Sequence, residues 1–228
     1  MLRLARQLAA EFLGTFLVVL IAAGSSSVDP WLKAAGEPVL GTIGTALAYG
    51  LAVAVAIEVC APISGAHLNP AISLGQWATR RINTWRLAGY TVAQLAGAVA
   101  AASLLETVIP DSAWQPAGLG TPVLASSLSR AQGMGLEAVL TFVVCLVFFR
   151  TAAVSGKPSG WAVGASVAAA VMVAGPFTGA ALNPARAFGP AFVFSHWANH
   201  GVWWVGPLSG GVFAAWISSA LGHSPEGV

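Results

Sequence analysis

The chain has 228 residues, of which 57% are hydrophobic and only 8% are charged, and its formal net charge is +2. Soluble domains carry about 25% charged residues, so this composition excludes an ordinary soluble protein and indicates a membrane protein. Six apolar runs come close to the roughly 20 residues that a helix needs to cross a bilayer. In chain order they are Phe12–Val28, Pro38–Ile57, Leu87–Leu105, Gly133–Phe149, Gly160–Val173 and Val202–Leu221.

Three of these runs need comment. The first begins beside Glu11 and has no obvious small-residue cleavage site, so we expect a retained helix rather than a signal peptide. The fourth is interrupted by Glu137, and the fifth stops at the Gly175-Pro176 break. These two are predicted as spans from their places in an internal repeat, described below.

The distribution of Lys and Arg predicts the orientation, because cytoplasmic loops of membrane proteins carry an excess of both. Lys33 and Arg130 fall on one side of the predicted spans, and Arg186 lies inside an apolar stretch. The others lie on the opposite side, which is therefore expected to be cytoplasmic and to hold both termini: Arg3, Arg6, Arg80, Arg81, Arg86, Arg150 and Lys157. Short termini and loops favour a bacterial inner membrane.

A twelve-residue segment occurs twice, because residues 64–75 align with 178–189 without a gap and share Gly-Ala and Leu-Asn-Pro-Ala. Upstream, Glu11 aligns with Glu137. Each copy contains three spans, an odd number, so the second must insert upside down relative to the first, which places a functional site between the halves at mid-membrane. We expect one channel domain over residues 1–228, with inverted repeats at about 1–109 and 130–228 and an external loop at 110–129.

Each repeat carries an Asn-Pro-Ala motif after its second span, in a segment too short to cross the membrane. Asn is a good helix N-cap and Pro suits the first helical position, so each motif predicts the start of a half-helix. Non-helical backbone before it is tolerated at membrane depth only beside a watery cavity or inside protein. The fold class is therefore an all-α membrane protein with six transmembrane helices plus two re-entrant half-helices. The motif residues are Asn69, Pro70, Ala71, Asn183, Pro184 and Ala185.

Two half-helices that enter from opposite faces point both N-termini at one centre, each with about half a positive charge, and should repel cations there. We expect the Asn69 and Asn183 amides to donate to a passing water and interrupt a proton-conducting chain. Exposed carbonyls before each motif should line the path as a ladder of acceptors. The predicted ladder comprises Gly65, Ala66, His67, Gly179, Ala180 and Ala181.

Acids inside membrane helices are usually functional or paired. Because Glu11 and Glu137 are equivalent in the repeat, one role should serve both, namely accepting hydrogen bonds from the re-entrant loops; the alternative is a snorkelling Glu11 and an unrelated Glu137. His67 is expected to hold its loop rather than bind a metal. For Glu58, the inner vestibule and the membrane interface stay open.

Other residues have less specific expectations. The two cysteines, Cys60 and Cys145, fit neither a metal site nor a disulfide framework and should pack in the interior. The histidines and tryptophans near the last span fit an interfacial belt and wall packing. They are His196, His200, Trp197, Trp203 and Trp204.

These motifs resemble the aquaporin family, also called major intrinsic proteins, over essentially the entire chain. The resemblance implies a homotetramer with one pore per subunit and a selectivity filter next to the second motif. Counting back from the motifs, the filter positions fall at Tyr49, Val171, Ala180 and Arg186. An Arg facing an aromatic ring leaves a narrow slot, whose width and lining decide what passes.

The filter points two ways on selectivity. Strict water channels of the family put His where Val171 stands and often a larger residue where Ala180 stands, so this set looks closest to the nodulin-26-like type, which admits glycerol and neutral metalloid acids. Yet Ala187 replaces the Asp typical of glycerol facilitators, and Ala191 resembles the water-selective type. We expect a passive channel for water and small uncharged solutes that excludes protons and ions; a strictly water-selective channel is the alternative.

Other functional classes fit less well. A secondary transporter shares inverted repeats but needs coupling acids in its pore, and only Arg186 offers charge there. A non-conducting structural membrane protein is a further alternative. No paired carboxylates, activated nucleophile, phosphate loop or metal cluster indicates an enzyme, and no cofactor or metal is expected. The expected partners are water, small neutral solutes and the lipid bilayer, with no nucleic acid.

Overall fold

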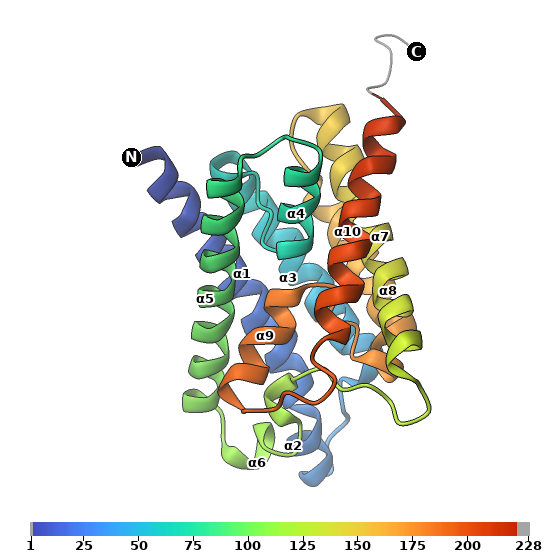
Figure 1. The fold of residues 1–228 in the computed structure, drawn as a ribbon. Helices are drawn as coiled ribbons and strands as arrows, with labels where there is room; N and C mark the ends of the chain where they lie inside the picture. Colours follow the sequence, from blue (N-terminus) through green and yellow to red (C-terminus); the bar gives the residue numbers. More distant parts are fainter. Residues whose placement is uncertain (1, 223–228) are drawn as a thin grey trace.

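The computed structural model describes residues 2–222, and within them every regular element is a helix (Figure 1). Six helices are long, and two short ones begin at the Asn-Pro-Ala motifs. The long helices are α1 (Leu2–Ser27), α3 (Gly41–Ser64), α5 (Thr84–Val108), α7 (Arg130–Ser155), α8 (Gly160–Thr178) and α10 (Val202–Ala220). The short ones are α2 (Asp29–Ala34), α4 (Pro70–Ala78), α6 (Asp111–Trp114), η1 (Gly118–Gly120) and α9 (Pro184–Val193).

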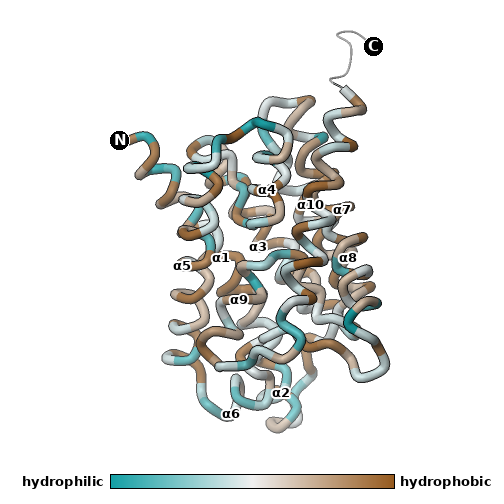
Figure 2. Tube along the Cα trace, viewed as in Figure 1, coloured by the Kyte–Doolittle hydropathy of each residue, from teal (hydrophilic) through white to brown (hydrophobic). Residues whose placement is uncertain are grey.

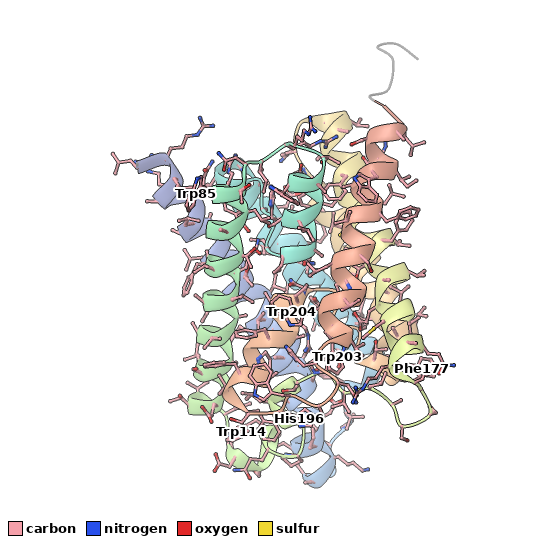
Figure 3. The ribbon with its side chains drawn as sticks, viewed as in Figure 1. Trp85, Trp114, Phe177, His196, Trp203 and Trp204 are labelled. Atoms are coloured by element: carbon pink, nitrogen blue, oxygen red, sulfur yellow. The ribbon has the colours of Figure 1, made fainter. Side chains whose placement is uncertain are left out.

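Hydropathy agrees with a membrane-spanning bundle. Five of the long helices, all but α10, are long and apolar enough to cross a bilayer. Helix α10 has 19 residues, among them three tryptophans, three glycines and three serines. Hydrophilic residues gather at the two ends of the bundle (Figure 2), and the labelled Trp85 lies at one end while Trp114 and His196 lie at the other (Figure 3). This pattern matches aromatic residues at the two membrane interfaces.

Two spans are longer than the apolar runs predicted. The second was expected to end at Ile57 and continues to Ser64, and the fifth was expected to stop at Val173 and continues to Thr178. The first span also begins earlier than the predicted Phe12, because α1 starts ten residues before it. Helical backbone thus extends past the apolar segment at each of these ends, so apolar run length underestimates helix length.

Proline did not end either of the two extended helices. Pro62 and Pro176 both lie inside the last turn, where the ring removes only one backbone hydrogen bond. The true ends are set by glycines in the left-handed region, Gly65 with φ 88° and Gly179 with φ 72°, whose amides close the last turn. The break predicted at Gly175-Pro176 was therefore placed one turn too early.

The two halves interlock rather than sit side by side. Helix α3 of the first half packs along α8 of the second, α4 packs against α10, and α9 packs against α5. In Figure 1, α4 lies in the upper part of the bundle and α9 in the lower part, so the half-helices approach each other from opposite ends. Each half-helix is thus held mainly by a long helix of the other half, and the predicted inverted repeat is confirmed as the architecture.

Close approach of α3 and α8 depends on two glycines. A Cβ on Gly50 would come within 2.5 Å of the Gly164 carbonyl oxygen, and a Cβ on Gly164 would fall on the Gly50 carbonyl oxygen. Side chains at either position would force the two helices apart, because both obstacles are backbone atoms. The halves therefore meet through a glycine contact.

We expect Gly164→Val to destabilise the fold by about 3 kcal/mol or more, because overpacking at a rigid contact cannot relax. Thermal unfolding of the detergent-solubilised protein measures the effect. The matched control is Gly135→Ala in α7, where a Cβ would meet nothing within 4 Å. Because alanine favours a helix more than glycine does, this variant should be as stable as wild type or slightly more stable. Equal melting temperatures for Gly164→Val and wild type would contradict this account of the interface.

Candidate functional site

The site is built around the starts of α4 and α9. Asn69 and Asn183 have extended backbone (φ −156° and −152°), and each side-chain oxygen accepts the backbone N–H two residues on, from Ala71 at 2.8 Å and Ala185 at 2.9 Å. Proline follows each cap as the first helical residue. Both half-helices therefore begin where the Asn-Pro-Ala motifs predict.

The two motifs are joined to each other across the centre of the molecule. The Asn69 amide nitrogen donates to the Leu182 carbonyl oxygen, and the Asn183 amide nitrogen donates to the Leu68 carbonyl oxygen, both at 2.9 Å. One N–H of each amide is used in this exchange, so one N–H per amide is left to donate to a molecule beside it. The positive ends of both half-helices are thereby fixed at one point.

The first loop is held from behind by a buried carboxylate, Glu11 on α1, which is fully buried. Its Oε1 accepts the Ser64 hydroxyl at 2.6 Å and the His67 amide at 2.9 Å, and its Oε2 accepts the Leu68 amide at 2.7 Å. The Gln94 amide nitrogen of α5 also donates to Oε2, at 2.8 Å. Four donors thus converge on one carboxylate.

The second loop has the same arrangement around Glu137 on α7. Its Oε1 accepts the Thr178 hydroxyl at 2.6 Å and the Ala181 amide at 3.0 Å, and its Oε2 accepts the Leu182 amide at 2.8 Å. Equivalent positions of the repeat supply equivalent donors, with Thr178 in the place of Ser64. The hydroxyl that begins both copies of the twelve-residue segment was therefore a readable signal that sequence reasoning did not use.

Backbone strain explains why the loops need such support. Left-handed φ values occur at non-glycine residues in equivalent pairs, 50° at Ala66 with 43° at Ala180, and 51° at Leu68 with 56° at Leu182. Such a conformation costs on the order of 1–3 kcal/mol per non-glycine residue and persists only when the surroundings impose it. The carboxylates bond the backbone next to or at these residues, so they stabilise the strained shape.

Arg186, in the first turn of α9, is 3% exposed. Its Nη1 donates to the Gly120 carbonyl oxygen at 2.7 Å, and its guanidinium carbon lies 6.0 Å from the centroid of the Tyr49 ring. The Tyr49 hydroxyl in turn donates to the Ala181 carbonyl oxygen at 2.7 Å. Both side chains are therefore held by backbone carbonyls, and the role of Gly120 was not visible in the sequence.

Two separate cavities lie at the layer formed by Tyr49 and Arg186. An enclosed one of about 30 Å³, large enough for a water molecule, is lined by Tyr49 and both motif asparagines. An open one of about 340 Å³ is lined by Arg186 and Gly179 together with Gly120. Tyr49 thus lines the smaller cavity and Arg186 the larger, open one. The enclosed cavity is completed by Val18, Val53, Ile57, His67, Leu68, Ile72, Val144, Val163, Val167 and Leu182.

The other two predicted filter residues lie in the protein interior. Val171 and Ala180 are buried in the same apolar cluster as Tyr49. Among the predicted ladder carbonyls, that of Ala181 already accepts the Tyr49 hydroxyl, so only one of its lone pairs is available to a permeating molecule.

His67 lines the enclosed cavity, and its ring contacts α4 and α5. Its Nδ1 lies 3.0 Å from the Ser73 hydroxyl, and its ring meets the Tyr90 ring edge-on at 5.0 Å between centroids. The Tyr90 hydroxyl donates to the Ser64 carbonyl oxygen at 2.7 Å. Across residues 2–222 no group of three His, Cys, Asp or Glu side chains could hold a metal ion.

The residues around the start of α10 lie away from the cavities. The His200 ring meets Trp197 edge-on at 4.9 Å, and partial burial, with a further contribution from His196, lowers the pKa of His200 below its usual value. Trp203 is buried and its indole N–H donates to the Thr178 carbonyl oxygen at 2.9 Å. This region packs the wall behind the second loop.

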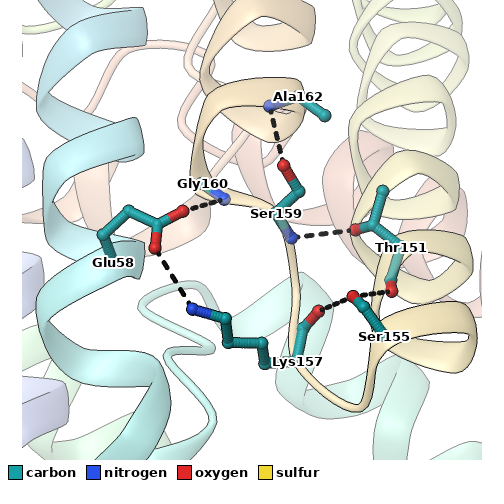
Figure 4. A network of polar contacts seen from close by, with 7 residues as sticks. All are labelled: Glu58, Thr151, Ser155, Lys157, Ser159, Gly160 and Ala162. Carbon is teal, nitrogen blue, oxygen red and sulfur yellow. Dashed lines mark hydrogen bonds and ion pairs between the residues drawn. The ribbon is translucent and has the colours of Figure 1, made fainter.

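Glu58 has a structural role at one end of the bundle (Figure 4). Its Oε1 accepts the Gly160 amide at 3.0 Å, at the start of α8, and its Oε2 pairs with the Lys157 ammonium at 3.5 Å. The Thr151 hydroxyl accepts the Ser159 amide at 3.1 Å in the same connection. Glu58 therefore anchors the turn between α7 and α8.

Comparison with known proteins agrees with this architecture. A family model described as Major intrinsic protein matches residues 1–218. The chain is 39% identical to Aquaporin TIP4-4 of Zea mays over 231 residues, which cover 96% of this chain and 90% of that protein. It is 39% identical to the Lens fiber major intrinsic protein of Gallus gallus over 214 residues, which cover 92% of this chain and 79% of that protein.

A solved structure has the same fold. The aquaglyceroporin from Plasmodium falciparum superposes with a TM-score of 0.82 at 25% sequence identity, covering 96% of this chain and 97% of that one. With the family model spanning nearly all of the sequence, relatives of 39% identity and the shared fold, the assignment rests on three independent comparisons. The chain therefore belongs to the major intrinsic protein, or aquaporin, family of passive multi-pass membrane channels.

Proposed function

We propose that the protein conducts water and small uncharged solutes passively through a path that runs past Asn69, Asn183 and the layer of Tyr49 and Arg186. The observation that carries the proposal is the reciprocal pair of bonds between the two motifs, which fixes both half-helix N-termini beside one enclosed cavity. Free amide N–H groups there can orient a water molecule by its oxygen. Val163 and Val167 supply an apolar wall on which water binds weakly and moves on.

Exclusion of cations and protons follows from the charges along this path. Two helix N-termini contribute about half a positive charge each at the centre, and Arg186 adds a full charge one layer away. A water that accepts hydrogen bonds from both asparagines has no free lone pair with which to receive a proton from its neighbour. Ions would also lose their hydration shells in a cavity of about 30 Å³.

The solute range beyond water depends on the filter layer. Val171 and Ala180 are small and apolar, which supports a slot wide enough for the carbon backbone of a polyol or for a neutral metalloid hydroxide. A strictly water-selective channel is the second candidate, and the specific observation in its favour is that Tyr49 is held by its hydroxyl beside a cavity sized for water.

Stopped-flow light scattering on proteoliposomes tests the proposal and separates the candidates. We expect fast shrinkage under an impermeant osmolyte and re-swelling under glycerol, both well above protein-free vesicles. Val171→His should suppress glycerol re-swelling and keep water flux, whereas Val173→His, on the exposed face of α8, should change neither. Water flux without glycerol re-swelling in the wild type would select the water-selective candidate.

Mercury sensitivity provides a further prediction. Cys60 and Cys145 are both buried, and Cys60 packs against Gly14. We expect mercuric chloride to inhibit wild-type water flux only weakly, and Ala180→Cys to make inhibition strong and reversible by a thiol reductant. Strong inhibition of a variant that lacks both native cysteines and has alanine at position 180 would contradict this interpretation.

Orientation and assembly remain part of the proposal. We propose that the end of the molecule that carries the α4–α5 and α7–α8 connections is cytoplasmic, because Arg80, Arg81 and Lys157 lie there. Family membership supports a homotetramer with one path per subunit. A bacterial inner membrane stays a prediction, since the relatives described above come from maize, chicken and a malaria parasite.

A further inference from the structure

His67 presents one ring nitrogen that the protein itself does not use. The residue is 6% exposed and lines the enclosed cavity. Its Nδ1 contacts the Ser73 hydroxyl at 3.0 Å, whereas its Nε2 has no hydrogen-bond partner within residues 2–222. The rings of Tyr90 and Phe148 meet the imidazole edge-on, with centroids 5.0 Å and 6.3 Å away, and hold its orientation. Nε2 is therefore the ring atom left to bind a molecule in the cavity.

A chain of hydrogen bonds behind His67 decides which ring nitrogen carries the proton. The Gln94 amide nitrogen donates one N–H to the Glu11 carboxylate at 2.8 Å and the other to the Ser73 hydroxyl oxygen at 3.0 Å. Because an amide nitrogen cannot accept a hydrogen bond, the Ser73 hydroxyl keeps its own proton to donate.

Among the described residues, the acceptor within reach of that hydroxyl proton is Nδ1 of His67. Nδ1 is therefore bare, and Nε2 carries the proton of the neutral ring. A ring protonated on Nδ1 would leave the Ser73 hydroxyl without an acceptor. Glu11, through Gln94 and Ser73, thus sets the tautomer of His67.

The second repeat keeps the same loop shape without this chain. In the twelve-residue alignment Ala181 stands in the place of His67, and Ala187 stands in the place of Ser73. Neither alanine side chain can form a hydrogen bond, yet both loops have the paired left-handed residues described above. Holding the loop therefore does not by itself require the chain, and His67 makes the central path asymmetric, with an imidazole N–H on the α4 side alone.

We propose that the hydrogen-bond chain keeps His67 as a donor-only group of the conducting path and thereby excludes protons at a second place, next to the asparagines. A bare Nε2 could accept a proton from the water chain, which is the property that makes histidine a proton shuttle. Nε2–H donates to a water oxygen but offers no lone pair, so a neighbouring water cannot pass a proton to it. Ser73 and Gln94 are positioning residues that act through His67. This inference rests on the proposed function, because it concerns water in the same cavity.

Nitrogen-15 NMR of the reconstituted protein, labelled at histidine, measures the tautomer directly. Protonated and bare ring nitrogens give separate signals, and the signals that disappear in His67→Gln assign this residue. We expect a bare Nδ1 and a protonated Nε2 in wild type at neutral pH, and the same pattern in Ser73→Thr, which keeps the hydroxyl.

Gln94→Glu should reverse the chain, because it has the same shape but replaces the amide donor by an oxygen that accepts the Ser73 hydroxyl. Ser73 would then accept the proton of His67 Nδ1, and Nε2 would become bare. The wild-type spectrum tests the tautomer even if Gln94→Glu fails to fold.

Proteoliposomes that contain a pH-sensitive dye, together with stopped-flow light scattering, give the ratio of proton to water permeability. We expect this ratio to rise about threefold or more in Gln94→Glu, because the bare Nε2 can accept a proton. Ser73→Thr is the matched control and should have the wild-type ratio. The double variant Gln94→Glu/His67→Gln should have the ratio of His67→Gln alone, which would show that the leak passes through the imidazole rather than the added acid.

A protonated Nδ1 in wild type, or an unchanged tautomer in folded Gln94→Glu, would overturn the assignment of the chain. A reversed tautomer with the wild-type permeability ratio would overturn its role in proton exclusion and leave His67 as support for its loop. Each of these results can occur while wild-type water flux is fast. Failure of the proposed function would instead appear as absent water flux with the expected tautomer in place.

Discussion

Glu137→Ala should unfold at a far lower temperature than wild type and conduct almost no water. The variant removes the acceptor for the Thr178 hydroxyl and for the amides of Ala181 and Leu182, all of which are buried. A buried donor left unsatisfied costs about 1–3 kcal/mol, so two lost amide partners alone cost about 2–6 kcal/mol. The strain of Ala180 and Leu182 would also lose its support.

Thermal unfolding in detergent, followed by water flux of the reconstituted protein, measures both effects. Glu137→Gln has the same size and keeps one acceptor oxygen. Its melting temperature and water flux should therefore lie between those of wild type and Glu137→Ala. Glu106→Ala removes an exposed acid from α5 and should leave stability and flux unchanged. If Glu137→Ala and Glu106→Ala had the same melting temperature, the loop before α9 would be held by something other than the Glu137 carboxylate.

Arg186→Ala is the second large expected effect, and it acts on selectivity rather than stability. Removing the guanidinium widens the layer beside Tyr49 and deletes a buried positive charge. We expect glycerol permeability to rise severalfold and proton leakage to become measurable. Water flux should be kept, because the cavity at Asn69 and Asn183 is untouched.

Proteoliposomes loaded with a pH-sensitive dye report the proton leak under an imposed potential. Arg186→Lys keeps the charge but replaces a planar fork by a single ammonium, so it should still exclude protons while admitting more glycerol. The contact with the Gly120 carbonyl is expected to weaken in both variants. Unchanged solute and proton selectivity in Arg186→Ala would show that the constriction lies elsewhere.

The starts of the two half-helices and the repeat could be predicted from the sequence because each depends on local chemistry. Asn followed by Pro fixes a helix N-terminus within two residues, and equivalence of Glu11 and Glu137 needs only alignment. Helix ends were less predictable, since the second apolar run stopped at Ile57 and Pro176 was interpreted as a break, although both helices continue to a last turn that glycine closes.

Contacts made between distant segments could not be predicted in this way. The bond from Arg186 to the Gly120 carbonyl depends on how the connection between the halves folds back over α9, and no residue type marks a carbonyl as an acceptor. The bonds of Asn69 to Leu182 and of Asn183 to Leu68 need both loops in place at once. For Glu58 the partner is an amide at the start of another helix, which the sequence does not indicate.

The osmotic water permeability of proteoliposomes that contain Val167→Trp tests the central claim, that the path runs through the enclosed cavity between the two loops. Val167 lines that cavity, whereas Val143 on α7 is 43% exposed on the outside of the bundle. We predict fast water flux for wild type and Val143→Trp, and near-background flux for Val167→Trp at a melting temperature that shows it is folded. Wild-type flux through folded Val167→Trp would contradict the account.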